Sequence, residues 1–163
     1  MAGEVSVWAR RRSRRLLVQA IYEWQLSGND YATVRGAFSD RDDFRKADAD
    51  YFDVILGAVM RRSEELDGHF SEYLDRAVAS LDPVERGILR MATFELLERI
   101  EVPWLAIINE ATQLAKVFGA QDSYKYVNGV LDRVGRKLRP VEAEHAARQR
   151  SAPQRDDAAS DDA

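Results

Sequence analysis

Apolar residues recur at helical spacing along almost the whole chain, and no stretch alternates with period two for long enough to predict a strand. The first helical segment carries an apolar stripe at i, i+3, i+4 and i+7, formed by Leu17, Ala20, Ile21 and Trp24. Gly28 suits the C-terminal end of this helix, and Asn29 or Asp30 can cap the next one.

Six further helical segments are predicted, at residues 31–38, 50–68, 70–78, 83–100, 103–118 and 123–138, with a charged loop over 39–49. The clearest helix start is Asp82, which can cap, followed by Pro83 at the first helical position and Glu85 placed as in a capping box. About seven helices joined by short loops indicate an all-α bundle. The ordered domain is expected to span 1–140, followed by a disordered or transiently helical acidic tail over 141–163.

The composition narrows the class of protein. The chain has 163 residues and a net charge of −4, so it suits one domain and is not a general binder of polyanions. It has no cysteine, which excludes disulfides and cysteine-based metal sites. Neither a secretory signal nor an apolar run of about 20 residues is visible, so a cytoplasmic protein that does not enter membranes is expected.

Little in the sequence indicates catalysis. His145 lies in the acidic tail, and His69 lies at a helix junction beside Gly68, where a surface role is the simpler interpretation. No phosphate-binding glycine loop or zinc-protease motif is present. The acidic residues of the 39–49 loop and its border lack the spacing of an EF-hand. We therefore expect no enzymatic activity, no metal and no cofactor.

Five arginines run directly into the first helix: Arg10, Arg11, Arg12, Arg14 and Arg15. At about 100° per residue, Arg11, Arg15, Val18 and Tyr22 fall within about 60° of each other, nearly opposite the apolar stripe. Arg12 flanks these positions, whereas Arg10 and Arg14 point nearer the core at the helix start, where the core need not cover them. Positive charge in the first turn opposes the helix dipole, which favours an anionic ligand over a merely solvated face.

A second aromatic and basic group, QDSYKYVNG, surrounds the start of the last predicted helix at residues 121–129. Lys125 and Tyr126 lie in its first turn, where backbone N–H groups also point outward. Arginines, a lysine and tyrosines suit single-stranded nucleic acid, because cations contact phosphates and aromatic rings stack on unpaired bases. The simpler alternative is that these tyrosines cover the bundle.

Three stretches resemble the NusB family of bacterial transcription antitermination factors: RRRSRRLLVQAIYEWQLSGND, LDPVERGILRMATFELL and VPWLAIINEATQLAKVFGAQDSYKYVNGVLDRV. The resemblance runs in order over roughly residues 8–140. It implies an all-helical fold of two packed sub-bundles, no enzymatic activity, and binding of boxA-type RNA from ribosomal RNA operon leaders. It also implies a complex with the ribosomal protein NusE that acts on RNA polymerase with NusA and NusG.

The resemblance also implies which residues bind. Its RNA site corresponds to Arg10, Arg11, Arg12, Arg14, Arg15, Tyr22, Gln121, Asp122, Lys125 and Tyr126. Asp122 is acidic, so beside RNA it is expected either to cap the helix or to restrain affinity. Tyr73 and Glu85 are candidates for the NusE surface, although Glu85 also suits its helix start.

Several alternatives remain open on sequence grounds. Some members of the family dimerise, and a homodimer would hide the arginine face. A related helical domain is fused to ribosomal RNA methyltransferases, but a following α/β domain is absent from these 163 residues. A helical module whose arginines contact an acidic protein is the alternative from another functional class. The acidic tail, finally, is a candidate to fold back onto the arginines.

Overall fold

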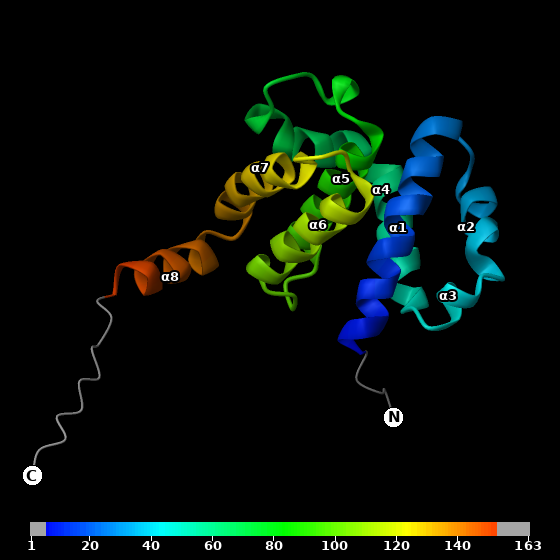
Figure 1. The fold of residues 1–163 in the computed structure, drawn as a ribbon, viewed down its shortest axis with the longest axis horizontal. Coiled ribbons are helices and arrows are strands. Elements are labelled where there is room, and N and C mark those ends of the chain that lie inside the picture. Colours follow the sequence, from blue (N-terminus) through cyan, green and yellow to red (C-terminus); the bar gives the residue numbers. More distant parts are fainter. Residues whose placement is uncertain (1–5, 153–163) are drawn as a thin grey trace, which may run out of the picture.

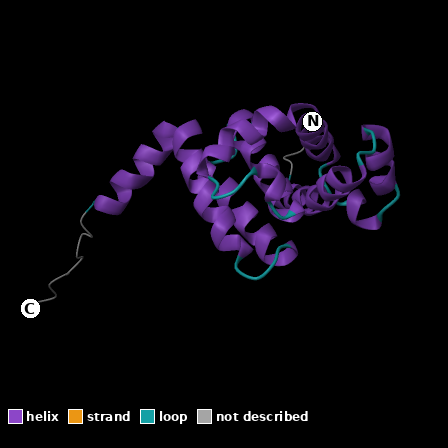
Figure 2. Ribbon diagram, turned by 90° about the horizontal axis from the view of Figure 1, so that it is seen from above, coloured by secondary structure: helices purple, strands orange, loops and turns teal. Residues whose placement is uncertain are grey.

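The computed structural model describes residues 6–152, and their backbone forms helices and connecting turns without a β-strand (Figure 2). The prediction of an all-α fold is confirmed. The described α-helices are α1 (Val7–Ser27), α2 (Tyr31–Ser39), α3 (Asp42–Arg45), α4 (Ala49–Phe70), α5 (Pro83–Glu98), α6 (Trp104–Phe118), α7 (Ser123–Leu138) and α8 (Pro140–Ser151). Two short 3-10 helices, η1 (Ser71–Tyr73) and η2 (Val78–Ser80), join α4 to α5.

The helices form two groups that share one core. Helices α2, α3 and α4 pack around α1, while α5, α6 and α7 pack against one another. The groups meet where α1 and α4 lie against α5, and α1 also contacts α6 (Figure 1). Helix α8 projects away from this body. The core includes fully buried side chains from both groups, among them Leu17, Ile21, Phe52, Leu56, Phe70, Ile88, Leu89, Ile107 and Leu131.

The ends of the N-terminal helices follow from local hydrogen bonding. Helix α1 begins at Val7, because the Ser6 hydroxyl accepts hydrogen bonds from the backbone N–H groups of Trp8 and Ala9. It ends at Gly28, whose φ of 69° places it in the left-handed region that glycine adopts readily. Asp30 then caps α2 by accepting from the Thr33 N–H at 2.9 Å, as predicted.

The connections differ from the prediction in three places. The predicted loop over 39–49 contains the single turn of α3, whose Phe44 packs edge-on against Phe52. The predicted helix over 70–78 is replaced by η1 and η2, which are three residues each. Helix α4 continues past Gly68 to Phe70, because exposed Gly68 is tolerated inside a helix.

The predicted helix start at Asp82 is confirmed, but the capping box is not formed. The Asp82 carboxylate accepts from the Val84 N–H at 2.9 Å, and Pro83 occupies the first turn. The Glu85 carboxylate instead accepts from the Ser123 hydroxyl at 2.7 Å. Because this bond is to another helix, Glu85 ties the start of α7 to the start of α5.

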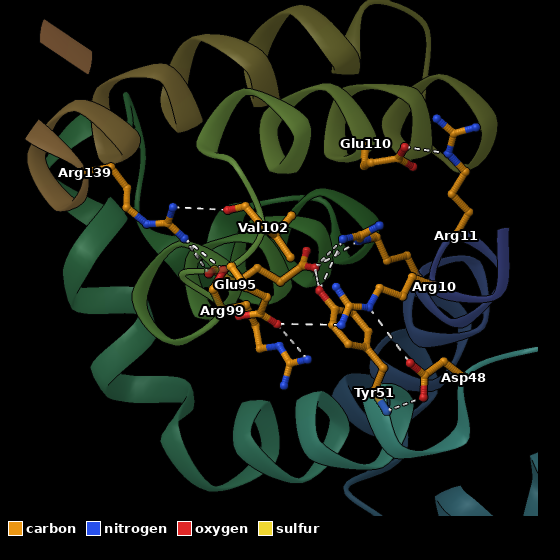
Figure 3. Close-up of polar contacts among 11 residues, drawn as sticks. Arg10, Arg11, Asp48, Tyr51, Glu95, Arg99, Val102, Glu110 and Arg139 are labelled. Carbon is orange, nitrogen blue, oxygen red and sulfur yellow. Dashed lines mark hydrogen bonds and ion pairs between the residues drawn. The ribbon is translucent and has the colours of Figure 1, made fainter. Parts of the chain in front are cut away.

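Residues 140–151 form helix α8, whereas the sequence predicted a disordered or transiently helical tail over 141–163. Residues 140–151 are rich in alanine, glutamate and arginine, which favour helix, and Pro140 suits the first turn. Just before it, Arg139 is buried and donates to the backbone carbonyls of Glu95, Leu96, Arg99 and Val102, which closes the C-terminal end of α5 (Figure 3). The remainder of the predicted tail, from residue 153 onward, lies outside the described residues.

Glu142 joins this arrangement to α6. Its carboxylate accepts from the Trp104 N–H at 2.9 Å, at the start of α6, and from Arg139 at 2.6 Å. Partial burial opposes its ionisation, but the hydrogen bonds from Trp104 and Arg139 outweigh that effect and lower the pKa of Glu142. The ionised carboxylate therefore stabilises the junction of α5, α6 and α8.

A charged pair lies inside the body, where α1 meets α5. Arg14 of α1 is 4% exposed and Glu95 of α5 is 1% exposed, and their side chains lie 2.9 Å apart. Tyr51 of α4 donates its hydroxyl to Glu95 and accepts from Arg14 (Figure 3). Burial, together with the Glu95 carboxylate, raises the pKa of Tyr51 above its ordinary value, so the phenol remains a donor at neutral pH.

Arg14→Met should lower the free energy of unfolding by about 3–5 kcal/mol, because it leaves Glu95 charged and buried without its partner. Arg15→Met is the matched control: it removes the same charge from an exposed neighbour and should change stability by no more than about 0.5 kcal/mol. Urea denaturation followed by circular dichroism measures both. Equal losses in the two variants would contradict the structural role of Arg14.

Glu142→Gln should destabilise the protein by about 0.5–1 kcal/mol at pH 7, since Glu142 is partly exposed and solvent screens the pair. A carboxyl whose folded pKa is lowered stabilises above its ordinary pKa of 4.5, and that contribution is lost as the pH falls through the folded value. The difference between variant and wild type should therefore shrink in thermal melts as the pH falls below about 4.5. A difference that does not change over this range would count against the ionic contribution.

Candidate nucleic-acid interface

The structure divides the five arginines of α1 between the core and the surface. Arg14 is buried against Glu95, so the expectation that the core leaves it uncovered is wrong. The expectation that Val18 lies on the outer stripe is also wrong, because Val18 is only 2% exposed. Helix α1 has neighbours on several sides (α2, α4, α5 and α6), so its buried arc is wider than the apolar stripe alone indicated. Three arginines remain exposed on one face: Arg11, Arg12 and Arg15.

Arg10 is intermediate in exposure between the buried Arg14 and the exposed arginines. Its guanidinium stands 4.8 Å from the centroid of the Tyr51 ring, and it lies 3.7 Å from Glu101 and 4.0 Å from Asp48 (Figure 3). The Arg10 side chain is 25% exposed. Arg10 is thus partly held by carboxylates and an aromatic ring, and its charge is less available to a ligand than the charges of Arg12 and Arg15.

The exposed arginines line a groove between α1 and α6, which we call the arginine groove. Its volume is about 530 Å³, and its lining residues are Trp8, Arg11, Arg12, Arg15, Glu110, Gln113, Leu114 and Val117. Glu110 of α6 accepts from Arg11 Nε at 2.7 Å (Figure 3). Among residues 6–152, no carboxylate forms an ion pair with Arg12 or Arg15. The groove therefore combines a net positive charge with an apolar wall.

Tyr22 extends this face along α1. It is 41% exposed and lines a shallower hollow beside Phe38 and Arg41. Arg41 donates to Gln19 at 3.2 Å, one helical turn from Arg15. Tyr22 is therefore on the same face of α1 as the arginine groove, but about 10 Å beyond Arg15 at 1.5 Å per residue.

The α6–α7 loop lies close to the end of the same groove. Val117 lines the groove and α7 begins at Ser123, so the five residues between them span at most about 20 Å. Gly119 allows a tight course here, because a Cβ at this position would lie 2.6 Å from the Ala115 carbonyl oxygen and 2.9 Å from the Ser123 hydroxyl. Gln121, Asp122 and Lys125 are all exposed on this loop and helix start.

Asp122 does not cap α7 through its side chain. It occupies the N-cap position with a φ of 65°, and its carboxylate lies 3.3 Å from the Lys125 ammonium. Of the two roles expected for this residue, side-chain capping is wrong. The carboxylate instead places a negative charge directly beside the lysine of the candidate site.

Tyr126 is half-buried and contacts the connection between α4 and α5. Its hydroxyl donates to Asp75 at 3.0 Å, and the Arg76 guanidinium lies 5.2 Å from its ring centroid. Hydrogen bonds from Arg76 and Tyr126 lower the pKa of Asp75 to about 2, so its carboxylate is ionised at neutral pH. The ring of Tyr126 is consequently already in contact with an arginine, whereas that of Tyr22 is more open.

Tyr73 lies on the connection between α4 and α5, and Glu85 lies in the first turn of α5. Tyr73 ends η1 and is partly buried, and Glu85 holds Ser123 as described above. Neither lines the arginine groove. The two candidates for protein binding thus belong to a different region from the exposed arginines.

Sequence reasoning missed part of the groove. Trp8 had a detectable signal, because it stands seven residues before Arg15 and hence on nearly the same face of the helix. Glu110, Gln113 and Val117 had none, since nothing in the order of residues states that α6 packs beside α1.

Two further classes of site are absent from the described part of the chain. Between residues 6 and 152, no three acidic or histidine side chains gather in a way that would hold a metal ion. Over the same range, none of the helices is long and apolar enough to span a bilayer.

Comparison with known proteins is consistent across sequence and structure. Residues 11–136 match the NusB family. The chain is 49% identical over 135 residues to the transcription antitermination protein NusB of Alcanivorax borkumensis, covering 83% of this chain and 90% of that protein. It is also 49% identical over 132 residues to the NusB of Cronobacter sakazakii, covering 81% and 95%.

Solved structures agree with the fold. A crystal form of T. maritima NusB superposes with a TM-score of 0.73 at 28% identity, over 83% of this chain and 96% of that one. A structure of the antitermination factors NusB and NusE in complex with dsRNA gives a TM-score of 0.67 over 81% of this chain and 99% of that one. At 21% identity, the second likeness is evidence for the fold alone.

Proposed function

Because the chain belongs to the NusB family of transcription antitermination proteins, we propose that it binds single-stranded boxA-type RNA through α1 and the α6–α7 loop. The observation that carries the proposal is the arginine groove, in which Arg12 and Arg15 are exposed and have no ion pair among residues 6–152. Guanidinium groups in an open groove suit the phosphates of an unpaired strand.

The contribution of each predicted residue follows from its surroundings. Arg12 and Arg15 contact phosphates directly, and Arg10 and Arg11 contribute charges that nearby carboxylates partly screen. Arg14 acts through the fold, because it is buried against Glu95. At the loop, Gln121 and Lys125 contact the strand. Tyr22 stacks on a base, and Tyr126 does so only when Arg76 moves aside.

The protein partner in this proposal is NusE. A solved structure with the same fold holds NusB and NusE together with dsRNA. Because this chain belongs to the NusB family by sequence, the same partner is proposed for it. Tyr73 and Glu85 lie away from the groove, so a partner bound there leaves the arginines free for RNA. In the cytoplasm, the two proteins together would cover a longer RNA segment and act on RNA polymerase with NusA and NusG.

Replacing Arg12 and Arg15 together by alanine should weaken binding of labelled boxA-type RNA without changing the thermal melt, because both side chains are exposed. If each contacts one phosphate, the magnitude of the log–log salt slope should fall by about 1.4. Affinity and slope are measured by titration at several salt concentrations, with and without NusE, against a scrambled RNA.

The control pair is Arg45 and Arg61, which are exposed on α3 and α4 and do not line the arginine groove. Alanine at both positions removes the same total charge and should leave the slope nearly unchanged. An equal loss in both pairs would indicate general attraction rather than a site. Wild-type protein that binds no RNA but captures an acidic protein through Arg12 and Arg15 would favour the alternative of a protein-binding module.

Asp122→Asn should tighten RNA binding, because it removes a negative charge that lies 3.3 Å from Lys125. The backbone should be retained, since asparagine tolerates the left-handed conformation of this position. The gain should disappear in the Lys125→Ala background if the effect passes through the lysine. Unchanged affinity of the single variant would remove Asp122 from the site.

A further inference from the structure

We propose that Trp8 is a base-stacking residue at the open end of the arginine groove, where it holds one unpaired base of the bound RNA. The inference rests on the proposed function and deepens it, because it assigns an aromatic contact to a groove known so far by its charges. It concerns a residue three positions outside the segment that matches the family.

Trp8 is both exposed and ordered. It is 65% exposed, although large aromatic side chains are usually well covered. Its backbone N–H donates to the Ser6 hydroxyl at 3.1 Å, so it belongs to a capped first turn of α1. A rigid helical position reduces the entropy that a ligand would otherwise lose on fixing the ring.

The surroundings of the ring suit a nucleobase better than a second apolar surface. Trp8 shares its groove with Arg11, Arg12 and Arg15, and the Arg11 guanidinium lies 5.0 Å from the ring centroid. With this cation on the ring, a base can stack on the exposed part while neighbouring phosphates meet the other arginines. An apolar protein partner would instead have to desolvate Arg12 and Arg15, which have no ion pair in the described chain.

The spacing along α1 fits an extended strand. Trp8, Arg15 and Tyr22 are separated by seven residues each, so they lie on nearly one face at intervals of about 10 Å. Two aromatic rings thus flank the arginines over about 21 Å of helix. This alternation of ring, cation and ring allows base stacking at both ends of a segment whose phosphates are held in the middle.

Val7 provides the comparison that separates stacking from general exposure. It is also 65% exposed and precedes Trp8 directly, but it does not line the groove. Single exposed apolar residues are ordinary on protein surfaces, so Val7 needs no ligand. A role specific to Trp8 must therefore appear as a difference between variants at these adjacent positions.

The test titrates single-stranded boxA-type RNA into the wild type and into Trp8→Ala, Trp8→Phe and Val7→Ala. Trp8→Ala should weaken binding about 5- to 150-fold, the range that corresponds to the loss of one stacked base. Trp8→Phe should recover most of the affinity, and Val7→Ala should match the wild type. The salt slope should be the same in all four proteins, because no charge is removed.

RNAs that lack one base at a time identify the contact. One abasic position should cost the wild type as much as Trp8→Ala does, and should cost Trp8→Ala protein nothing further. An equal affinity of Trp8→Ala and Val7→Ala would overturn the inference, as would a Trp8→Ala loss that is additive with every abasic position. If Trp8→Ala and Val7→Ala bind equally well but the Arg12 and Arg15 double variant still binds RNA more weakly than the wild type, the proposed RNA function is retained. Absence of any wild-type RNA binding would overturn both.

Discussion

The buried ion pair of Arg14 and Glu95 lies where α1 packs against α5, at the contact between the two groups of helices. Two charges taken out of water need hydrogen-bonding partners, and here Arg14 donates to Glu95 and to Tyr51, while the Tyr51 hydroxyl donates to Glu95. The pair and the buried Leu17, Ala20 and Ile21 together hold one side of α1 against the core. Since each residue advances the helix by about 100°, Arg11, Arg12 and Arg15 lie about 60°, 160° and 100° around the helix from Arg14.

The same constraint explains why adjacent arginines have different roles. Arg14 and Arg15 are neighbours in sequence, but one side chain is buried and the other is exposed. A run of five like charges in the first turns of a helix is unfavourable for an isolated helix. The unfavourable interaction of these charges with the helix dipole and with one another is reduced here, because Arg14 forms an ion pair with Glu95 and Arg11 forms one with Glu110. The charge that remains is concentrated on a face that a polyanion can reach.

The candidate site also depends on how α5, α6 and α7 are joined. Arg139 closes the end of α5 and Glu142 caps the start of α6, so the tight turn between these helices is held by residues from the far end of the domain. Glu85 and Gly119 set the course of the α6–α7 loop near the groove. These contacts give the groove a fixed wall. They also join the start of α5 to the start of α7, because Glu85 accepts from Ser123.

The sequence by itself determined the helical class, because periodicity, Asp30, Asp82 and Gly28 act within a few residues of where they stand. It also placed an exposed basic face on α1, since Arg11, Arg15 and Tyr22 follow from helix geometry alone. The burial of Arg14 and Val18, the inclusion of Trp8 with Glu110, and the contact between Tyr126 and Arg76 were decided only by the tertiary structure. Each of these depends on which helix packs beside α1 or α7, a choice made by contacts between residues far apart in the chain.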